Sequence, residues 1–293
     1  MSLRVLVTGA GGFVGGFLSR FLASKGCLVT ATTRRKLDKS IENNFGITWH
    51  YTDLSRTLGL TNDFDAIVHC AAEIPANCND PFLLYSRNIA ASKILFEYAS
   101  FANMKTVVFM SSVSVYGKII EDVLSEKTIP TDPDTYGRSK LDSEVILAKC
   151  VKQGLSSGLS IRLPGTVGRG SHHNFLSDCL KRIHSGDLIN AKNPESLFNN
   201  IVHVSDLAAF IHRWITSPKP GYEITNLGAE DPIKIKDVLS LMFKIAGKPE
   251  LFKFSDGGKK PFLINLDQAK KLGYEPRTVH KSVEAFVRDN FFN

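Results

Sequence analysis

The sequence of 293 residues lacks several features that would assign a chain to a class at once. It contains no run of 18 apolar residues, so we expect no helix that spans a membrane. Arg4 interrupts the first apolar stretch, which predicts a core strand there instead of a signal peptide. The five cysteines form no C-x-x-C pair, and no group of His and Cys has the spacing of a zinc site. We therefore expect a cytoplasmic protein with reduced thiols, no contact with membranes and no bound metal.

The sequence also lacks a concentrated basic region. The formal net charge is +7, but Lys and Arg are spread along the chain, and no basic stripe carries interleaved aromatic residues. Nucleic acid is therefore not the expected partner, whereas a small ligand that carries phosphate would use such a charge equally well. The hydrophobic content of 43% and the charged content of 22% are ordinary for a globular protein.

The first part of the sequence alternates short β-branched runs with helical patterns. This alternation predicts right-handed βαβ units, and hence an α/β fold with a Rossmann-type, doubly wound parallel sheet. The expected strands are residues 4–8, 27–33, 47–51, 66–72, 106–112 and 159–164. The expected helices are residues 13–26, 80–104 and 134–154.

The alternation becomes less regular after about residue 168. We therefore expect residues 1–168 to form a dinucleotide-binding domain, to which later segments at about 200–228 return. Residues 169–293 are then expected to form mainly a small C-terminal substrate lobe.

A glycine-rich turn directly follows the first expected strand. In "TGAGGFVG", Gly9, Gly12 and Gly15 follow the pattern G-x-x-G-x-x-G and open an amphipathic helix. Glycines let backbone N–H groups approach a pyrophosphate at the N-terminus of the helix. The position of the turn between a strand and a helix favours dinucleotide binding over an ordinary glycine-rich turn.

The end of the second expected strand indicates which dinucleotide binds. This segment reads "TATTRRK", and no carboxylate occurs before Asp38. Arginines such as Arg34 and Arg35 suit an adenosine 2′-phosphate, so NADP(H) is favoured and NAD(H) is the alternative. An exposed turn with solvated arginines is the competing interpretation. Asp53, after the third strand, could reach the adenine amino group or could cap a helix.

Tyr136 and Lys140 stand four residues apart in "YGRSK" and share one face of an expected helix. A solvated polar pair is one interpretation of this spacing. The other is a tyrosine whose pKa is lowered from about 10 toward neutrality by a neighbouring ammonium group.

Seven motifs occur in order along the chain: the glycine loop, "DL" at 53–54, "HCAA" at 69–72, "SSVSVYG" at 111–117, "YGRSK" at 136–140, "RLPGTVGRG" at 162–170 and "NIVHVSDLA" at 200–208. In this order they resemble the extended short-chain dehydrogenase/reductase family, the NAD-dependent epimerase/dehydratase group. The similarity covers nearly the whole chain and ends with "NLDQAKKLGYEP" at 265–276.

The resemblance implies roles for individual residues. Tyr136 would be the acid–base residue, Lys140 would also hold the nicotinamide ribose, and Ser112 would hold the substrate oxygen. The implied cofactor-binding residues are Gly9, Gly12, Phe13, Val14, Gly15, Thr33, Arg34, Arg35, Asp53, Leu54, Ala71, Ala72, Tyr136, Lys140 and Pro164. The implied substrate-binding residues are Ser112, Ser114, Tyr136, His172 and Asn174.

The sequence departs from the family pattern where members that act on sugar nucleotides carry arginines for the diphosphate. Asn199 and Asn200 stand at the first of these positions. Lys253, Lys259 or Lys260 could replace the second arginine, but only as point charges.

These features together predict an NAD(P)-dependent oxidoreductase that transfers hydride at a carbonyl or alcohol carbon of a sugar nucleotide, with a keto-sugar reductase favoured. The alternatives are a nucleotide-sugar epimerase, a reductase of a carbonyl compound without a nucleotide, and a non-catalytic regulator that binds a dinucleotide. The resemblance also implies a homodimer that pairs through the helices near 81–102 and 135–153.

Overall fold

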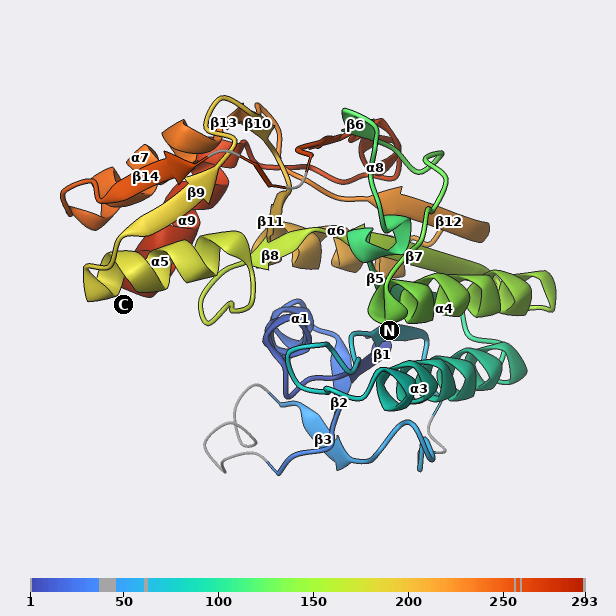
Figure 1. Cartoon of the computed structure of the whole chain (residues 1–293). Coiled ribbons are helices and arrows are strands. Elements are labelled where there is room, and N and C mark those ends of the chain that lie inside the picture. Colours follow the sequence, from blue (N-terminus) through green and yellow to red (C-terminus); the bar gives the residue numbers. More distant parts are fainter. Residues whose placement is uncertain (1, 37–45, 61–62, 256, 259, 292–293) are drawn as a thin grey trace. The chain divides into compact units, whose positions relative to one another are not determined.

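The computed structural model describes residues 2–36, 46–60, 63–255, 257–258 and 260–291 (Figure 1). Asp38 and Lys259 lie outside the described residues. The chain divides into two compact units. The first consists of Met1–Gly117, Pro130–Arg162 and Ala208–Thr225, and the second of Lys118–Ile129, Leu163–Leu207 and Asn226–Asn293.

The first unit is built on a seven-stranded sheet with the order β12-β7-β5-β4-β1-β2-β3. Its registered pairs β1–β2, β2–β3, β1–β4 and β4–β5 are all parallel, as the βαβ alternation predicts. The expected α/β, Rossmann-type sheet is therefore confirmed. Its strands are β1 (Arg4–Thr8), β2 (Leu28–Thr33), β3 (Thr48–Tyr51), β4 (Ala66–His69), β5 (Thr106–Ser112), β7 (Ser157–Leu163) and β12 (Gly221–Asn226).

Helices α1 (Phe13–Ser24), α3 (Pro81–Phe101) and α4 (Thr135–Lys152) connect strands of this sheet. Asp80 caps α3 and Asp134 caps α4, each by accepting a hydrogen bond from a backbone N–H of the first turn. Helices α3 and α4 lie side by side (Figure 1). Their apolar faces meet strands β4 and β5 in a core that includes Leu95, Phe96 and Leu147.

The second unit has its own apolar core, formed largely by helices α5 (Phe175–Ser185), α7 (Ile235–Ala246) and α9 (Val279–Phe291). Strands β8 (Gly165–Val167) and β11 (Ile201–His203) pair in parallel, as do β9 (Ile189–Lys192) with β14 (Phe252–Ser255) and β6 (Val123–Leu124) with β15 (Leu263–Ile264). The second unit also contains the antiparallel pair β10 (Leu197–Phe198) and β13 (Ile233–Lys234) and helix α8 (Asp267–Lys271). Helix α6 (Val204–Thr216), most of which belongs to the first unit, precedes β12.

No helix among the described residues is both long and apolar enough to cross a membrane. All five cysteines are free thiols.

Candidate functional site

The loop between β1 and α1 is shaped by glycines that no larger residue could replace. Gly9 has φ +67°, and a Cβ atom on it would lie 2.6 Å from the backbone nitrogen of Ala71. A Cβ atom on Gly15 would lie 2.4 Å from the carbonyl oxygen of Gly9. The backbone of the loop therefore runs unusually close to its neighbours, as the glycine pattern predicts.

The same loop opens helix α1 without a side-chain cap. Gly12 is the N-cap residue and has no side chain to accept from the first turn, which begins with Phe13 and Val14. No acidic residue stands in this first turn. The N–H groups and the positive end of the helix dipole can therefore receive an anionic group. The residues present fit the pyrophosphate of a dinucleotide.

The end of β2 forms one side of this loop. A Cβ atom on Gly11 would lie 2.5 Å from Oγ1 of Thr33, so Thr33 packs directly on the loop. Arg34 pairs with the buried carboxylate of Glu73, which follows β4. This ion pair raises the pKa of Arg34, and the hydrogen bond that Arg34 donates to Glu73 is the largest cause. Arg35 is exposed and forms no ion pair with any residue that the structure describes.

Asp53 and Leu54 lie in a turn after β3. Asp53 Oδ1 accepts from the backbone N–H of Ser55 at 3.0 Å and from its hydroxyl at 2.7 Å. The hydrogen bond from the Ser55 side chain lowers the pKa of Asp53. Leu54 is buried in the core of the first unit. The structure therefore shows Asp53 stabilising a turn, where the sequence offered a helix cap as the alternative to adenine binding.

Ala71 and Ala72 follow β4 on the other side of the glycine loop. The N–H of Ala71 donates to Oγ1 of Thr8 at 3.2 Å, and the same hydroxyl lies 2.7 Å from Nδ1 of His69. His69 is buried between Phe96 and Phe109. These contacts hold the end of β4 against the end of β1.

The three candidate catalytic residues all belong to the first unit. Ser112 ends β5, and its hydroxyl accepts from the N–H of Ser114 and donates to the Ser114 hydroxyl, both at 3.1 Å. Tyr136 lies in the first turn of α4. Lys140 is buried, donates to the carbonyl oxygen of Met110 at 2.8 Å, and has its Nζ 5.7 Å from the centroid of the Tyr136 ring. Lys140, one helical turn after Tyr136, thus connects α4 to the carboxyl-terminal part of β5.

The expected lowering of the pKa of Tyr136 is wrong for the chain alone. Burial raises the pKa of Tyr136 to about 12, and the negative charge of Asp134 adds to this shift. Burial also lowers the pKa of Lys140 to about 8. The sequence showed that Lys140 would share a helix face with Tyr136, but it did not show how strongly this face is desolvated.

A buried ion pair behind these residues was not found from the sequence. Glu144, one helical turn after Lys140, accepts from Nη2 of Arg162 at 2.7 Å and from the Ser111 hydroxyl at 2.6 Å. Arg162 Nη1 also donates to the hydroxyl of the fully buried Tyr116 at 2.8 Å. Helix α4 carries Tyr136, Lys140 and Glu144 four positions apart on one face. This spacing is the feature of the sequence that could have indicated a role for Glu144 beside the other two.

The remaining candidates belong to the second unit. The carbonyl oxygen of Pro164 accepts from the Thr166 hydroxyl at 3.4 Å. His172 is exposed, and its Nδ1 lies 3.1 Å from the carbonyl oxygen of Gly170. Asn174 caps α5, accepting from the N–H of Ser177 and donating to the carbonyl oxygen of Thr166. The structure thus gives Asn174 a local structural role.

Asn199 is also engaged within the second unit. It is buried, its Nδ2 donates to the carbonyl oxygen of Ile264 at 2.9 Å, and its Oδ1 accepts from the Ile264 N–H at 2.8 Å. Lys260 pairs with Asp122 at 2.9 Å, whereas Lys253 is exposed on β14. Within the described part of this unit, these residues form no bidentate clamp of the kind that grips a diphosphate.

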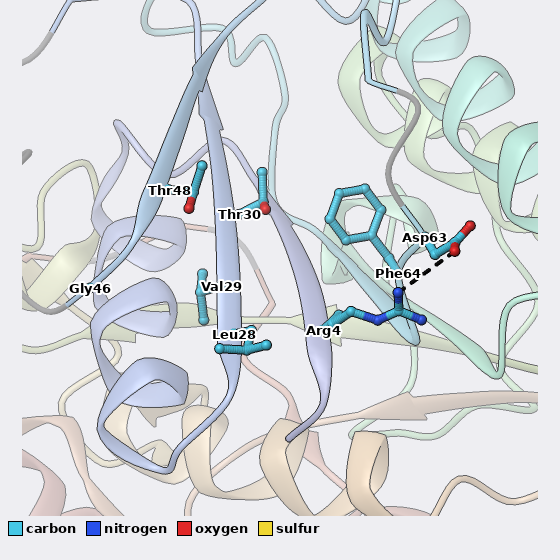
Figure 2. Close-up of a pocket in the computed structure, with 8 residues that line it drawn as sticks. All are labelled: Arg4, Leu28, Val29, Thr30, Gly46, Thr48, Asp63 and Phe64. Atoms are coloured by element: carbon cyan, nitrogen blue, oxygen red, sulfur yellow. Dashed lines mark ion pairs between the residues drawn. The ribbon is translucent and has the colours of Figure 1, made fainter. Parts of the chain in front are cut away.

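The structure also contains an open pocket of about 490 Å³ at the opposite edge of the sheet (Figure 2). It lies at the amino ends of the strands, where Arg4 begins β1, Leu28 begins β2 and Thr48 begins β3. Arg4 pairs there with Asp63 at 3.7 Å. Parallel α/β sheets bind ligands at the carboxyl ends of their strands, so this pocket is not the candidate site. No cluster of three or more His, Cys, Asp or Glu suited to a metal occurs within the described ranges.

Comparison with known proteins agrees with this geometry. The model of the NAD dependent epimerase/dehydratase family matches residues 5–228, more than half of the chain. The chain belongs to this family. The resemblance inferred from the ordered motifs is thereby confirmed, and the protein is an enzyme of the epimerase/dehydratase family.

Individual relatives of this epimerase/dehydratase family member differ in the reactions for which they are named. D-erythronate dehydrogenase of Haemophilus influenzae is 24% identical over 93% of this chain and 95% of its own length. UDP-glucose 4-epimerase of Halalkalibacterium halodurans is 24% identical over 97% of this chain and 93% of its own length. The solved structure of MoeE5 in complex with UDP-glucose and NAD superposes with a TM-score of 0.81, at 24% identity over 97% of both chains. This last similarity shows the fold.

Proposed function

We propose that this family member is an NAD(P)-dependent oxidoreductase that reduces a carbonyl carbon of a sugar nucleotide, that is, a keto-sugar reductase. The observation that carries the proposal is the position of Ser112, Tyr136 and Lys140 at the carboxyl edge of the sheet that bears the glycine loop. This is the edge at which open α/β sheets bind their ligands.

The chain's own residues would hold the dinucleotide and move the proton. The glycine loop and the first turn of α1 would receive the pyrophosphate, and Lys140 would hold the nicotinamide ribose. A bound nicotinamide supplies or accepts the hydride. Ser112 would hold the substrate oxygen as negative charge develops on it, and Tyr136 would give that oxygen its proton.

The protonation state of Tyr136 is compatible with carbonyl reduction. Because burial raises the pKa of Tyr136 to about 12, its phenol is protonated at neutral pH in the chain alone. A protonated phenol can act at once as the general acid that a carbonyl reduction requires. Oxidation of an alcohol would first require that proton to leave.

Arg34 and Arg35 favour NADP(H) as the cofactor in this proposal. No carboxylate stands between the end of β2 and Lys36, and both guanidinium groups are suited to a 2′-phosphate. MoeE5, with the same fold, was solved with NAD, so NAD(H) remains the alternative cofactor.

A reductase of a carbonyl compound without a nucleotide is a second candidate, favoured by the structure around Asn199. Its amide pairs with both backbone groups of Ile264, so it replaces the expected diphosphate arginine with a purely structural contact. D-erythronate dehydrogenase, a relative over nearly the full length, is named for a substrate without a nucleotide. An epimerase remains the alternative that UDP-glucose 4-epimerase represents among the relatives.

The proposal is tested by single-turnover hydride transfer from NADPH or NADH, followed by nicotinamide absorbance. The substrates are keto-sugar nucleotides and the matching keto sugars or keto acids without a nucleotide. Net oxidation of NADPH with a keto-sugar nucleotide supports the proposal. Oxidation only with compounds that lack the nucleotide supports the second candidate. Interconversion of sugar isomers without net cofactor oxidation identifies an epimerase. If dinucleotides bind but none of these substrates reacts, both candidate reductions are rejected.

A further inference from the structure

A buried carboxylate faces two arginines beside the glycine loop. The side chain of Glu73 is 8% exposed, and its Oε1 accepts from Arg34 and, at 3.2 Å, from Nη1 of Arg87. The side chain of Arg34 is 48% exposed, so one end of this ion pair is fixed in the protein and the other borders solvent.

The position of Glu73 does not depend on Arg34. Asn88 on α3 accepts from the backbone N–H of Glu73 at 2.7 Å and donates to its carbonyl oxygen at 3.1 Å. Asn88 Nδ2 also lies 3.0 Å from the hydroxyl of Ser139 on α4. Asn88 therefore holds the backbone of Glu73, and Arg87 still contacts its carboxylate when Arg34 leaves it.

The ion pair joins the two segments that flank the glycine loop. Arg34 follows β2 and Glu73 follows β4, and in the sheet these strands lie on either side of β1, whose end continues into that loop. Of the two arginines at the end of β2, Arg34 is therefore the one that already binds an anionic group of the protein. A dinucleotide with a 2′-phosphate would present a second anion to the same guanidinium.

We propose that Glu73 determines the preference between NADPH and NADH by competing with the adenosine 2′-phosphate for Arg34, an inference that rests on the proposed dinucleotide site. If Arg34 turns to the phosphate, its charge-assisted hydrogen bond to Glu73 is lost. If Arg34 binds both groups, the carboxylate and the phosphate repel each other. Each case weakens the binding of NADPH relative to NADH, which carries no 2′-phosphate.

Arg87 limits this penalty. A buried carboxylate that loses its last cation is strongly destabilised. Arg87 remains on Oε1 of Glu73 when Arg34 leaves, so Glu73 is not left unpaired. Arg87 thus allows Arg34 to move from the carboxylate to the phosphate. The strength of the contact between Arg34 and Glu73 then sets how much NADPH binding is weakened.

The test is calorimetric titration of the full chain with NADPH and with NADH, which needs no substrate. Glu73→Gln keeps the size of the side chain and its backbone contacts but removes the charge. We expect it to raise the ratio of NADPH to NADH affinity about tenfold, the order of one charge-assisted hydrogen bond. Adding Arg34→Ala to Glu73→Gln should cancel this gain. Arg87→Ala should lower the ratio.

Glu284→Gln is the matched control, because Glu284 pairs with Arg288 at 3.0 Å in the second unit. It should leave the ratio unchanged. An unchanged ratio in folded Glu73→Gln overturns the inference. If this variant does not fold, Glu73→Asp draws the carboxylate back from both arginines, since both contact its Oε1, and an unchanged ratio there overturns the inference equally. Absence of binding of both dinucleotides to the unaltered chain would instead reject the proposed function.

Discussion

Gly137 lies so close to Ser114 that a Cβ atom on it would stand 2.1 Å from the Ser114 carbonyl oxygen. Ser114 belongs to the 3₁₀ turn η1 (Val113–Tyr116), which Ser112 caps, and Gly137 follows Tyr136 in the first turn of α4. The glycine therefore lets the helix that carries Tyr136 pack backbone to backbone on the segment that carries Ser112. This contact fixes the distance between the two proposed catalytic hydroxyls.

Gly137→Ala is expected to cut turnover by roughly 10²-fold, because a displacement of about 1 Å at a reacting group has an effect of that size. The clash is with backbone, so the helix must move away from η1. We also expect the free energy of unfolding to fall by about 1–3 kcal/mol, as for other overpacked sites. Arg138→Ala, at the next and exposed position, is the control and should change neither quantity strongly. Normal turnover in Gly137→Ala would show that the close contact does not position the hydroxyls.

Tyr136→Phe keeps the ring and removes only the hydroxyl. It should reduce single-turnover hydride transfer by roughly 10²-fold or more, the usual scale for acid–base catalysis, and leave NADPH affinity nearly unchanged. Lys140→Met should weaken both, because the ammonium group is proposed to hold the ribose as well. Stopped-flow absorbance and a separate cofactor titration distinguish the two effects. Hydride transfer at the normal rate by Tyr136→Phe across pH 6–9 would remove Tyr136 from the mechanism.

The sequence predicted the sheet well because its strands are continuous apolar or β-branched runs. Residues 106–112 form a strand with the expected bounds, and the helix expected at 134–154 spans Thr135–Lys152, since Asp134 provides the cap. The two-residue strands of the second unit, such as Leu197–Phe198, were not predicted, because so short a pair has no periodicity of its own.

The partners of charged residues were harder to predict for a different reason. Arg34 and Glu73 are 39 positions apart in the sequence. They meet because β2 and β4 are the two neighbours of β1 in the sheet, and each residue follows the end of one of these strands. The pKa of Tyr136 likewise depends on burial, which is a property of the folded chain. Spacing placed Tyr136 and Lys140 on one helix face, but the sign of the pKa shift required the surroundings of that face.

The exposed apolar residues of α3 and α4 support the expected homodimer. Phe82 is 78% exposed on α3 and Val145 is 63% exposed on α4. A twofold axis would bury both faces against their copies. Val145→Asp should therefore convert a dimer into a monomer at micromolar concentration, as measured by light scattering. Leu28→Asp likewise replaces an exposed apolar residue by a carboxylate, but on β2, and should leave the mass unaltered. A monomer mass for the unaltered chain would reject the dimer.

His69 should make the first unit less stable in mild acid. Burial lowers the pKa of His69 to about 3, and the nearby Lys140 adds to this shift, whereas a histidine in the unfolded chain titrates near 6.5. Between these values the unfolded chain binds a proton that the folded chain does not. Above pH 6.5 the titration of His69 therefore costs the folded state no stability. The free energy of unfolding then falls as the pH falls from 6.5 toward 3. Between pH 7 and pH 5 the loss should be about 2 kcal/mol.

Denaturant unfolding at several pH values, followed by tryptophan fluorescence, measures this loss. Both tryptophans, Trp49 and Trp214, belong to the first unit, so the signal reports the unit that contains His69. We expect His69→Gln to lower stability at every pH, because it disturbs the contact with Thr8. It should also reduce the number of protons taken up on unfolding, which sets the slope of the free energy of unfolding against pH, by about one between pH 5 and pH 7. His280→Gln, at an exposed position of α9, should leave that dependence unchanged. A slope equal to that of the unaltered chain in His69→Gln would show that His69 is protonated in the folded state as readily as in the unfolded one.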